Sequence, residues 1–348
     1  MKGSLFGLAA AALFGVSTPL AKLLLPGTGP LALASLLYLG AGLGLVVYGA
    51  AVRAVSRRPS HEASLRREDL PIIAGIVLAG GVLAPVLMLD GLSRISAVSA
   101  SLLLNLEAPF TILLALIVFG EHLGVRAGLA CLLVLAGAVA LTYQPGEWRV
   151  GTLGAFEIAG ACLLWGLDNN LTQRLSLRDP VAIVTVKALG AGTCTLFLAW
   201  AASAPWPGFG AISAAGAVGA VCYGLSLVLD TYALRLLGAA REAAWFSTAP
   251  FAGALGAVAL LGERLRPADL AAMALMVAGA VLLLRERHRH AHAHEEMTHD
   301  HLHVHDEHHR HEHPGGAEVV EPHSHPHRHA SLVHDHPHVP DMHHHHAH

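Results

Sequence analysis

Two stretches in the two halves of this chain match each other: residues 14–20 read FGVSTPL, and residues 165–171 read WGLDNNL. Each sets an aromatic residue and a glycine inside a long apolar run. The surroundings repeat as well. Pro-Phe pairs at residues 109–110 and 250–251 are each followed by an apolar stretch and then by a Gly-Glu pair. Signals duplicated at matching offsets predict that the chain contains two copies of one structural unit.

Each copy holds five apolar stretches long enough to cross a membrane, since a spanning helix needs about 20 apolar residues. Pro, Gly and charged residues separate these stretches. The expected helices cover residues 3–25, 31–52, 70–90, 95–119, 124–142, 152–173, 181–203, 210–234, 238–261 and 267–285. The first could instead be a cleaved signal peptide, because Lys2 precedes it, but nine further apolar segments follow. Five spans per copy place the copies in opposite orientation, which is the architecture of many secondary transporters.

Composition agrees with an all-α integral membrane protein of ten transmembrane helices in two inverted five-helix repeats. The 348 residues are 54% hydrophobic and only 14% charged, and the mean hydropathy is +0.53. Soluble domains carry roughly 25% charged residues. We expect a first repeat at 1–142, an inter-repeat loop at 143–151, a second repeat at 152–285 and a disordered His-rich tail at 286–348.

Lys and Arg are concentrated in alternate loops of this ten-helix arrangement. They are most frequent in the loops that share a side with both termini, including residues 53–67 and 174–178. The positive-inside rule therefore predicts a multi-pass protein of the cell (inner) membrane with both termini in the cytoplasm. There is no basic patch with interleaved aromatic residues, so nucleic-acid binding is not expected.

With these features the chain resembles the EamA-type drug/metabolite transporter family, which consists of ten-helix carriers built from two five-helix repeats. The resemblance covers residues 3–285 and rests on the Gly-centred motifs, the Pro-Phe runs and the Gly-Glu pairs. It implies a central cavity lined by both halves and small organic molecules as substrates. One position departs from the family pattern: members often carry Arg about seven residues after the Pro of the second helix, where this chain has Leu37. Lys187 holds the equivalent place in the seventh helix.

Polar and ionisable residues inside apolar spans are costly and by default mark a transport pathway. We expect a substrate site formed between the repeats by residues of the first, sixth and seventh spans: Ser17, Thr18, Asp168, Asn169, Asn170 and Lys187. The alternative is that the Asp168 cluster is a solvated helix end beside Arg174. Glu107 lies two residues before Pro109, which bends a helix, so both are expected to act in coupling or gating. The alternative for Glu107 is a structural hydrogen bond, or an ion pair with Lys187.

Other polar residues of the spans favour structural roles. Asp90 and Asp230 each precede an Arg by four or five positions, which predicts ion pairs at helix ends. The four cysteines lie singly in apolar runs without CxxC spacing, so we expect small buried residues rather than disulfides or a zinc site. No catalytic constellation or nucleotide motif is present. A carrier that needs no cofactor is therefore expected, and not an enzyme.

The tail contains all but two of the chain's 26 histidines, and most of them alternate with other residues. Neutral imidazole suits Zn, Ni, Co and Cu, and three or four such ligands complete a tetrahedral zinc site. The alternative is a pH-responsive polar tail that binds metals incidentally. The expected metal ligands are His288, His290, His292, His294, His299, His301, His303, His305, His308, His309, His311, His313, His323, His325, His327, His329, His334, His336 and His338.

These observations predict a secondary active transporter that exports small organic metabolites or drugs by alternating access, as one half rocks against the other. The cytoplasmic tail would bind divalent transition metals. One alternative is a divalent metal (Ni/Co/Zn) efflux carrier, for which the tail would collect ions at the cytoplasmic mouth. The spans contain no His and few paired carboxylates, which argues against it. Another alternative is a membrane-anchored metal store or sensor.

Overall fold

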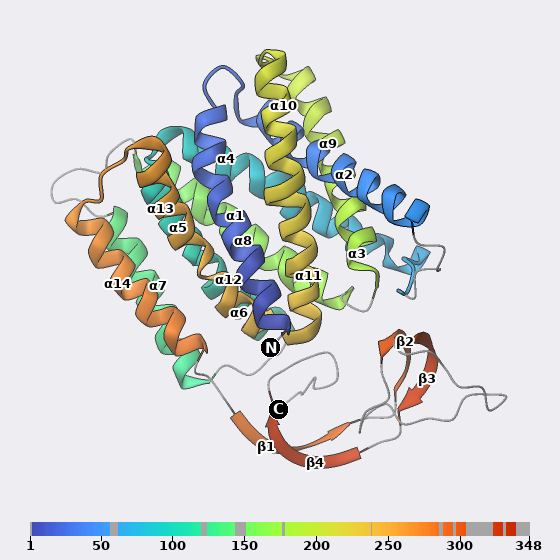
Figure 1. Cartoon of the computed structure of the whole chain (residues 1–348). Helices are drawn as coiled ribbons and strands as arrows, with labels where there is room; N and C mark the ends of the chain where they lie inside the picture. Colours follow the sequence, from blue (N-terminus) through green and yellow to red (C-terminus); the bar gives the residue numbers. More distant parts are fainter. Residues whose placement is uncertain are drawn as a thin grey trace.

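The chain forms a bundle of α-helices followed by short strands (Figure 1). The computed structural model describes residues 2–55, 62–119, 124–142, 151–175, 178–237, 239–284, 288–294, 297–303, 323–329 and 332–338. The first half contains α1 (Lys2–Leu24), α2 (Pro30–Val55), η1 (Arg67–Asp69), α3 (Leu70–Ile76), η2 (Val77–Leu83), α4 (Ala84–Arg94), α5 (Ala97–Leu103), η3 (Leu104–Leu106), α6 (Glu107–Phe119) and α7 (Val125–Thr142). The second half contains α8 (Gly151–Arg174), α9 (Pro180–Ala201), α10 (Phe209–Val218), η4 (Gly219–Leu225), α11 (Ser226–Leu237), α12 (Ala239–Phe246), α13 (Ala249–Leu261) and α14 (Pro267–Leu284).

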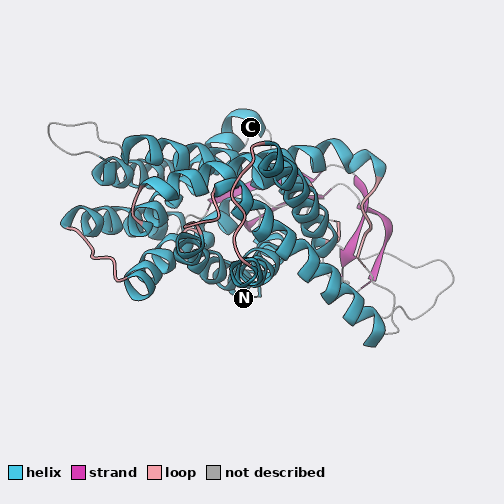
Figure 2. Cartoon of the chain, turned by 90° about the horizontal axis from the view of Figure 1, so that it is seen from above, coloured by secondary structure: helices cyan, strands magenta, loops and turns pink. Residues whose placement is uncertain are grey.

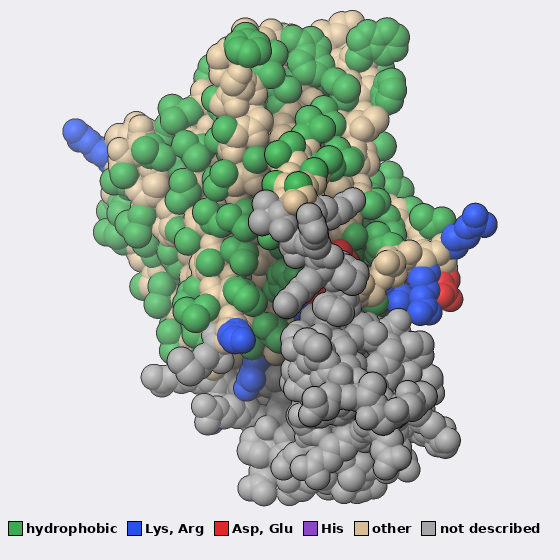
Figure 3. All heavy atoms as spheres, turned by 45° about the vertical axis from the view of Figure 1, so that its right-hand side comes forward, with side chains coloured by type: hydrophobic (Ala, Val, Ile, Leu, Met, Phe, Trp, Pro, Cys, Tyr) green, Lys and Arg blue, Asp and Glu red, His purple; other side chains and the backbone are tan. Residues whose placement is uncertain are grey.

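These elements make the ten predicted membrane-spanning segments. The third span joins α3, η2 and α4, the fourth joins α5, η3 and α6, the eighth joins α10, η4 and α11, and the ninth joins α12 and α13. In the described part of the chain, nine spans are long and apolar enough to cross a membrane. The other, α8, has 24 residues and is less apolar because it carries the cluster Asp168–Asn170. On the face in Figure 3, hydrophobic side chains cover most of the bundle and few charged ones are visible. The predicted all-α membrane fold is confirmed.

The second helices of the two halves begin alike. α2 starts at Pro30 and α9 at Pro180. Proline suits the first position of a helix because the N–H it lacks would have no partner there. At α9 the side chain of Asp179 caps the helix by accepting hydrogen bonds from the backbone N–H of Val181 at 2.9 Å and of Ala182 at 3.3 Å. The paired prolines therefore mark equivalent helix starts.

The two halves are interleaved. α1 packs on α11 and α13 of the second half, and α8 packs on α4 and α6 of the first. α2 packs against α9, and α7 packs against α14, where the two helices run side by side at one edge of the bundle (Figure 1). Seen from above, the helices lie together in one bundle (Figure 2). The first helix of each half therefore packs into the opposite half.

The glycines of the two matching motifs are the points where these helices cross. A Cβ on Gly15 would lie 2.2 Å from the carbonyl oxygen of Ala249, just before Pro250. A Cβ on Gly166 would lie 2.9 Å from the backbone nitrogen of Thr111, just after the Pro109-Phe110 pair. Both distances are too short for a side chain, so only glycine allows the backbones to approach this closely. Each motif thus packs against the Pro-Phe pair of the other half, as the inverted repeat requires.

The described parts of the tail are four strands in two antiparallel pairs, β1 (His288–His294) with β4 (Leu332–His338), and β2 (Met297–His303) with β3 (His323–His329). In the backbone register, histidine stands opposite histidine, for example His290 opposite His336 and His301 opposite His325. Alternation every second residue is the period of a strand. His305, His308, His309, His311, His313 and the loop 143–150 lie outside the described residues.

Candidate functional site

Four spans depart from regular α-helix near the middle of the bundle. η2 and η4 are π-helical segments at equivalent places in the third and eighth spans. The fourth span contains a 3₁₀ turn shortly before Pro109. The ninth span is interrupted between α12 and α13 just before Pro250. Proline removes a backbone donor and breaks the ladder, and π segments occur frequently at functional sites. Transporters place their binding sites at such discontinuous helices.

A buried ion pair joins α8 to α9 beside this irregular region. The ammonium of Lys187 contacts Oδ2 of Asp168, and the two residues are 5% and 3% exposed. Gly80 of η2 leaves room for the carboxyl, because a Cβ there would lie 2.2 Å from Cγ of Asp168. Asp168 is thus not a solvated helix end beside Arg174. Opposite charges compensate each other inside the bundle, where either alone would be costly.

Glu107 and Asn169 form a second polar contact next to the pair. Nδ2 of Asn169 donates a hydrogen bond to Oε1 of Glu107 at 2.8 Å. Glu107 therefore pairs with an amide, whereas the partner of Lys187 is Asp168. Glu107 also lines a cavity of about 10 Å³ together with residues of α1, η3, α12 and α13. This volume suffices for one water molecule, so the centre is closed around its own side chains.

None of the other predicted substrate residues is hydrogen-bonded to this group in the described part of the chain. Asn170 donates through Nδ2 to the carbonyl oxygens of Thr111 at 3.0 Å and Gly166 at 2.8 Å, which ties α8 to α6. Ser17 and Thr18 are fully buried in α1, and Ser17 lies beside the hydroxyl of Tyr223. The structure thus brings Asp168, Asn169 and Lys187 together with Glu107.

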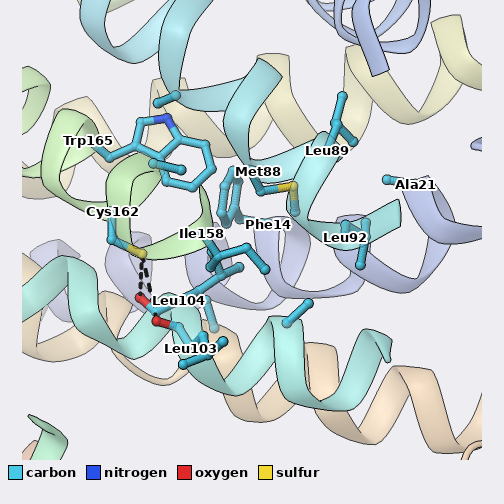
Figure 4. Close-up of a cluster of buried hydrophobic side chains, with 14 of the residues drawn as sticks. Phe14, Ala21, Met88, Leu89, Leu92, Leu103, Leu104, Ile158, Cys162 and Trp165 are labelled. Carbon is cyan, nitrogen blue, oxygen red and sulfur yellow. Dashed lines mark hydrogen bonds between the residues drawn. The ribbon is translucent and has the colours of Figure 1, made fainter. Parts of the chain in front are cut away.

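Aromatic side chains fill the space between α1 and α8. The rings of Phe14 and Trp165 meet edge to face with centroids 5.7 Å apart (Figure 4), and Phe14 also contacts Tyr223. The hydroxyl of Tyr38 donates to the carbonyl oxygen of Gly80 at 2.9 Å, and the indole N–H of Trp165 donates to the same oxygen at 3.1 Å. The carbonyl of the π segment is thereby satisfied by side chains, as buried backbone groups must be. Sequence reasoning missed Tyr38, because one tyrosine in an apolar helix carries no distinctive signal.

The cysteines are free, as predicted, but they are not all buried. The thiol of Cys162 donates weakly to the carbonyl oxygens of Leu103 and Leu104 at 3.7 and 3.8 Å (Figure 4). This contact supports the backbone of the 3₁₀ turn in the fourth span. Cys222 is buried in η4, whereas Cys194 is exposed on the surface of the bundle.

A second pair of buried acidic residues lies in α11 and α12. Asp230 and Glu242 are 8% and 1% exposed, and their carboxyl groups are hydrogen-bonded to each other. The prediction that Asp230 forms an ion pair at a helix end is wrong, because Arg235 instead contacts Glu62. Sequence reasoning missed Glu242 altogether. Its neighbour Arg241 and its place near the start of a span are typical of a solvated helix end.

One end of the bundle is closed by an arginine network, defined here as Glu62, Asp69, Arg178 and Arg235. Arg235 contacts Glu62 at 3.0 Å and donates to the carbonyl oxygen of Arg178 at 2.5 Å, and Arg178 contacts Asp69 at 2.9 Å. Burial raises the pKa of the Glu62 carboxyl, and the positive charge of Arg235 opposes this shift. The network ties the α2–α3 connection of the first half to α9 and α11 of the second.

The opposite end is closed by contacts that also cross between the halves. Glu263 accepts hydrogen bonds from the backbone N–H of Ala97 at 2.9 Å and of Val98 at 2.8 Å, at the start of α5. Arg94 contacts Glu157 of α8 at 3.0 Å and Asp90 at 2.7 Å, which confirms the predicted helix-end pair of Asp90. Contacts at both ends therefore hold the centre closed in this conformation.

Among the side chains that the structure describes, no three His, Cys, Asp or Glu gather in a group that could hold a metal ion. The tail histidines fall outside this statement, because only their backbone is described in the four strands. The donor set at the centre combines carboxylates and an amide with an ammonium group. An ammonium cannot ligate a metal, since it has no lone pair.

Comparison with known proteins shows which family has this architecture. The profile of the EamA-like transporter family matches the chain twice, at residues 1–143 and 152–285. An "Uncharacterized transporter" of Methanothermobacter thermautotrophicus is 31% identical over 264 residues, covering 72% of this chain and 76% of the relative. A "Probable terminal-alkyne amino-acid exporter" of Streptantibioticus cattleyicolor is 28% identical over 251 residues, covering 71% and 84%.

A solved crystal structure shares the fold, with a TM-score of 0.61 at 20% identity, over 80% of this chain and 95% of the other. The family profile spans both halves of the bundle, including the ion pair and the paired Pro-Phe segments. The two relatives are both named as proteins that move solutes across membranes. The chain is a membrane transporter and belongs to the EamA-like transporter family.

Proposed function

We propose that this transporter is a secondary active exporter of small organic metabolites, and that its cargo binds at the Asp168–Lys187 pair. The observation that carries the proposal is the burial of both charges in one place beside two π-helical segments. Ionisable groups in a membrane interior are retained mainly for function. A fixed positive and a fixed negative charge suit a solute that has polar or charged groups of both signs.

The packing suggests how access alternates. α1 packs with α11 and α13, and α8 packs with α4 and α6. We propose that these two mixed groups, rather than the two sequence halves, move against each other. Opening the arginine network would expose the centre at one end, and parting Glu263 from α5 would expose it at the other. Glu107 and Pro109 lie where the fourth span is kinked, and we propose that they belong to the hinge between the two access states.

The distribution of arginines supports one orientation of the protein in the membrane. Arg66, Arg67, Arg174, Arg178 and Arg235 lie at the end of the bundle where α8 ends and α9 begins. We propose that this end faces the cytoplasm of a cell with the protein in its inner membrane, by the positive-inside rule. The tail follows α14, which ends on the same side, so it too would be cytoplasmic. Transport out of the cell then begins at the arginine network.

The exporter direction and an amino-acid-like cargo are supported by one relative's name, "Probable terminal-alkyne amino-acid exporter". A matched test uses proteoliposomes loaded with a terminal-alkyne amino acid. We expect efflux from vesicles with the wild-type chain, and loss of efflux with Asp168→Asn. The control Glu68→Gln changes an exposed carboxyl outside the two closures and should leave efflux unchanged. Efflux that persists in Asp168→Asn would contradict the assigned site.

We propose that the tail binds divalent transition metals and acts as an accessory to transport. Its histidines stand opposite one another in the backbone register of the two strand pairs, an arrangement that favours binding of an ion by ligands from two strands. Many overlapping ligand sets predict several labile ions of modest affinity. Titration of Ni²⁺ into the full chain and into a truncation after Arg287 tests this: the full chain should bind several ions, and the truncation none.

Metal efflux remains a second candidate because of the tail. It predicts that cellular Ni, Co or Zn falls when either the full or the truncated chain is expressed, and not with Asp168→Asn. The central ammonium of Lys187 argues against it, since a bare dication would be repelled at short range. A membrane-anchored metal store or sensor would show metal binding without efflux of any solute.

A further inference from the structure

Two buried carboxyl groups lie apart from the proposed cargo residues. Asp230 of α11 and Glu242 of α12 are hydrogen-bonded to each other and nearly inaccessible to solvent. Two carboxylates offer acceptors only, so a hydrogen bond between carboxyl groups requires a proton on one of them. Like charges in contact cannot both ionise in such a place. The pair therefore holds one proton in this conformation.

Charged side chains of neighbouring helices act on this pair. The elements packed against α11 and α12 include α1, α6, α8, α9 and α14. Among the described residues, Lys187 of α9, Asp168 of α8 and Glu107 of α6 act electrostatically on the pair. Two of these three neighbours are acidic, so a second negative charge on the pair would be disfavoured.

The hydrogen-bond pattern also indicates that the Asp230–Glu242 pair holds a proton. If both groups were ionised, Oε1 of Glu242 would be buried without a donor among the described residues. An unsatisfied buried acceptor is costly, and more so when charged. A shared proton removes that cost. The closed bundle therefore favours the protonated pair over the ionised one.

A separate feature connects the pair with the centre. Ala243, the neighbour of Glu242, lines the same small cavity as Glu107 and Asn105. Asn105 is 1% exposed, and its Oδ1 has no hydrogen-bond partner among the described groups. An unpaired acceptor at a cavity with room for one water marks a place for a hydrogen-bonded water molecule. That water would adjoin both Glu107 and the helix that carries Glu242.

Asp230 and Glu107 also lie at different depths along the membrane-spanning bundle. Asp230 precedes the end of α11 at Leu237 by about 10 Å, and Glu107 precedes the end of α6 at Phe119 by about 18 Å, at a rise of about 1.5 Å per residue. Both helices end on the side of the arginine network in the ten-span topology. The carboxyls therefore lead from that side towards the middle of the membrane.

We infer that Asp230 and Glu242 form a proton-binding site and that export is coupled to proton movement through this pair and Glu107. The coupling rests on the proposed function, whereas the proton-binding site does not. When the arginine network opens, the pair meets water, transfers its proton to a water molecule and leaves both carboxylates ionised. The pair takes a proton from water again before the bundle closes around it.

Infrared difference spectroscopy on the full chain in lipid bilayers tests the site directly. Between acidic and alkaline buffers, the wild type should lose a carbonyl band of a buried protonated carboxyl. The double variant Asp230→Asn, Glu242→Gln should lack this band, and the matched control Asp90→Asn, Glu157→Gln should keep it. A band that persists in the double variant, or that is absent from the wild type, would overturn the proton-binding site.

Transport of a terminal-alkyne amino acid in proteoliposomes tests the coupling. In the double variant Asp230→Asn, Glu242→Gln we expect loss of efflux driven by a pH gradient, while exchange of labelled for unlabelled solute continues at the wild-type rate. Loss of both activities would mean a structural role and overturn the coupling. If the wild type does not move this solute, the proposed cargo is wrong, and the infrared result still decides the proton site.

Discussion

At the scale of single residues, the centre depends on charges that compensate each other. Lys187 and Asp168 are both nearly inaccessible, and each is the other's charged partner. Removing one member of such a pair leaves a buried charge uncompensated, which typically costs about 3–5 kcal/mol, whereas replacing both can be neutral. The pair thus constrains folding.

This predicts a non-additive mutational cycle. Lys187→Met alone should lower the free energy of unfolding by about 3–5 kcal/mol, and Asp168→Asn combined with Lys187→Met should recover much of that loss. Both forms should lose transport, because the cargo contact is gone. Thermal unfolding of the purified proteins in detergent measures the cycle. A double variant as unstable as the single one would show that the two charges are not energetically coupled.

Most residues of this candidate site could be predicted from the sequence, but the contacts between them could not. Asp168, Asn169, Lys187 and Glu107 were recognisable because each interrupts an apolar span. Which amide meets which carboxylate depends on helix rotation, which composition does not record. Glu242 escaped notice for a related reason. Its position beside Arg241 near a helix start is typical of a solvent-exposed residue, whereas the packing of α1, α6, α11 and α14 on α12 buries it.

At the scale of elements, the fold depends on close helix crossings at glycine. The repeated motifs predicted that Gly15 and Gly166 are special, and the structure shows that each lets its helix touch the backbone of the opposite half. The π segments η2 and η4 were not predictable. Insertion of one residue into a helical turn leaves no mark in an apolar sequence, although it redirects the side chains that follow.

Gly15→Ala should therefore destabilise the bundle, since its Cβ would lie 2.2 Å from the carbonyl oxygen of Ala249. Overpacking of this kind costs about 1–3 kcal/mol. The matched control is Gly128→Ala in α7, where a Cβ would meet nothing within 4 Å. Measurement of the melting temperature of each variant tests this prediction. Equal melting temperatures for the two variants would contradict a close helix crossing at Gly15.

The tail provides a prediction about pH. Imidazole binds metal only when neutral, and its unperturbed pKa is about 6.5. Ni²⁺ binding by the full chain should therefore be strong at neutral pH and largely lost one unit below that pKa. Isothermal titration at the two pH values measures it. Binding that is unchanged on acidification would point to ligands other than the histidines.

At the scale of the whole molecule, the two ends of the bundle act as opposed closures. The arginine network closes one end, and Glu263 with Arg94 closes the other. The inverted repeat could be predicted from duplicated motifs and from an odd number of spans per copy. The interleaving of α1 and α8 could not, because it depends on which helices of the other half each motif meets.

Arg235→Gln should loosen only the end at which it lies. Its loss removes the contact with Glu62 and the donation to the carbonyl oxygen of Arg178. Hydrogen exchange should become faster at the amide of Asp179, which donates to Ala63 across this closure. Arg94→Gln, at the opposite end, serves as the control and should leave that amide unaffected. Equal acceleration by both variants would mean that the closures are not separate.

The proposed function requires the core to move an organic solute through the Asp168–Lys187 site. A mass-spectrometric profile of the medium tests this in cells that express the wild type, the truncation after Arg287 or Asp168→Asn, with cellular Ni, Co and Zn measured in the same cultures. We expect an organic solute to accumulate outside with the first two forms and not with Asp168→Asn, while metal content stays constant. A fall in cellular metal that requires Asp168, without any exported organic solute, would contradict it.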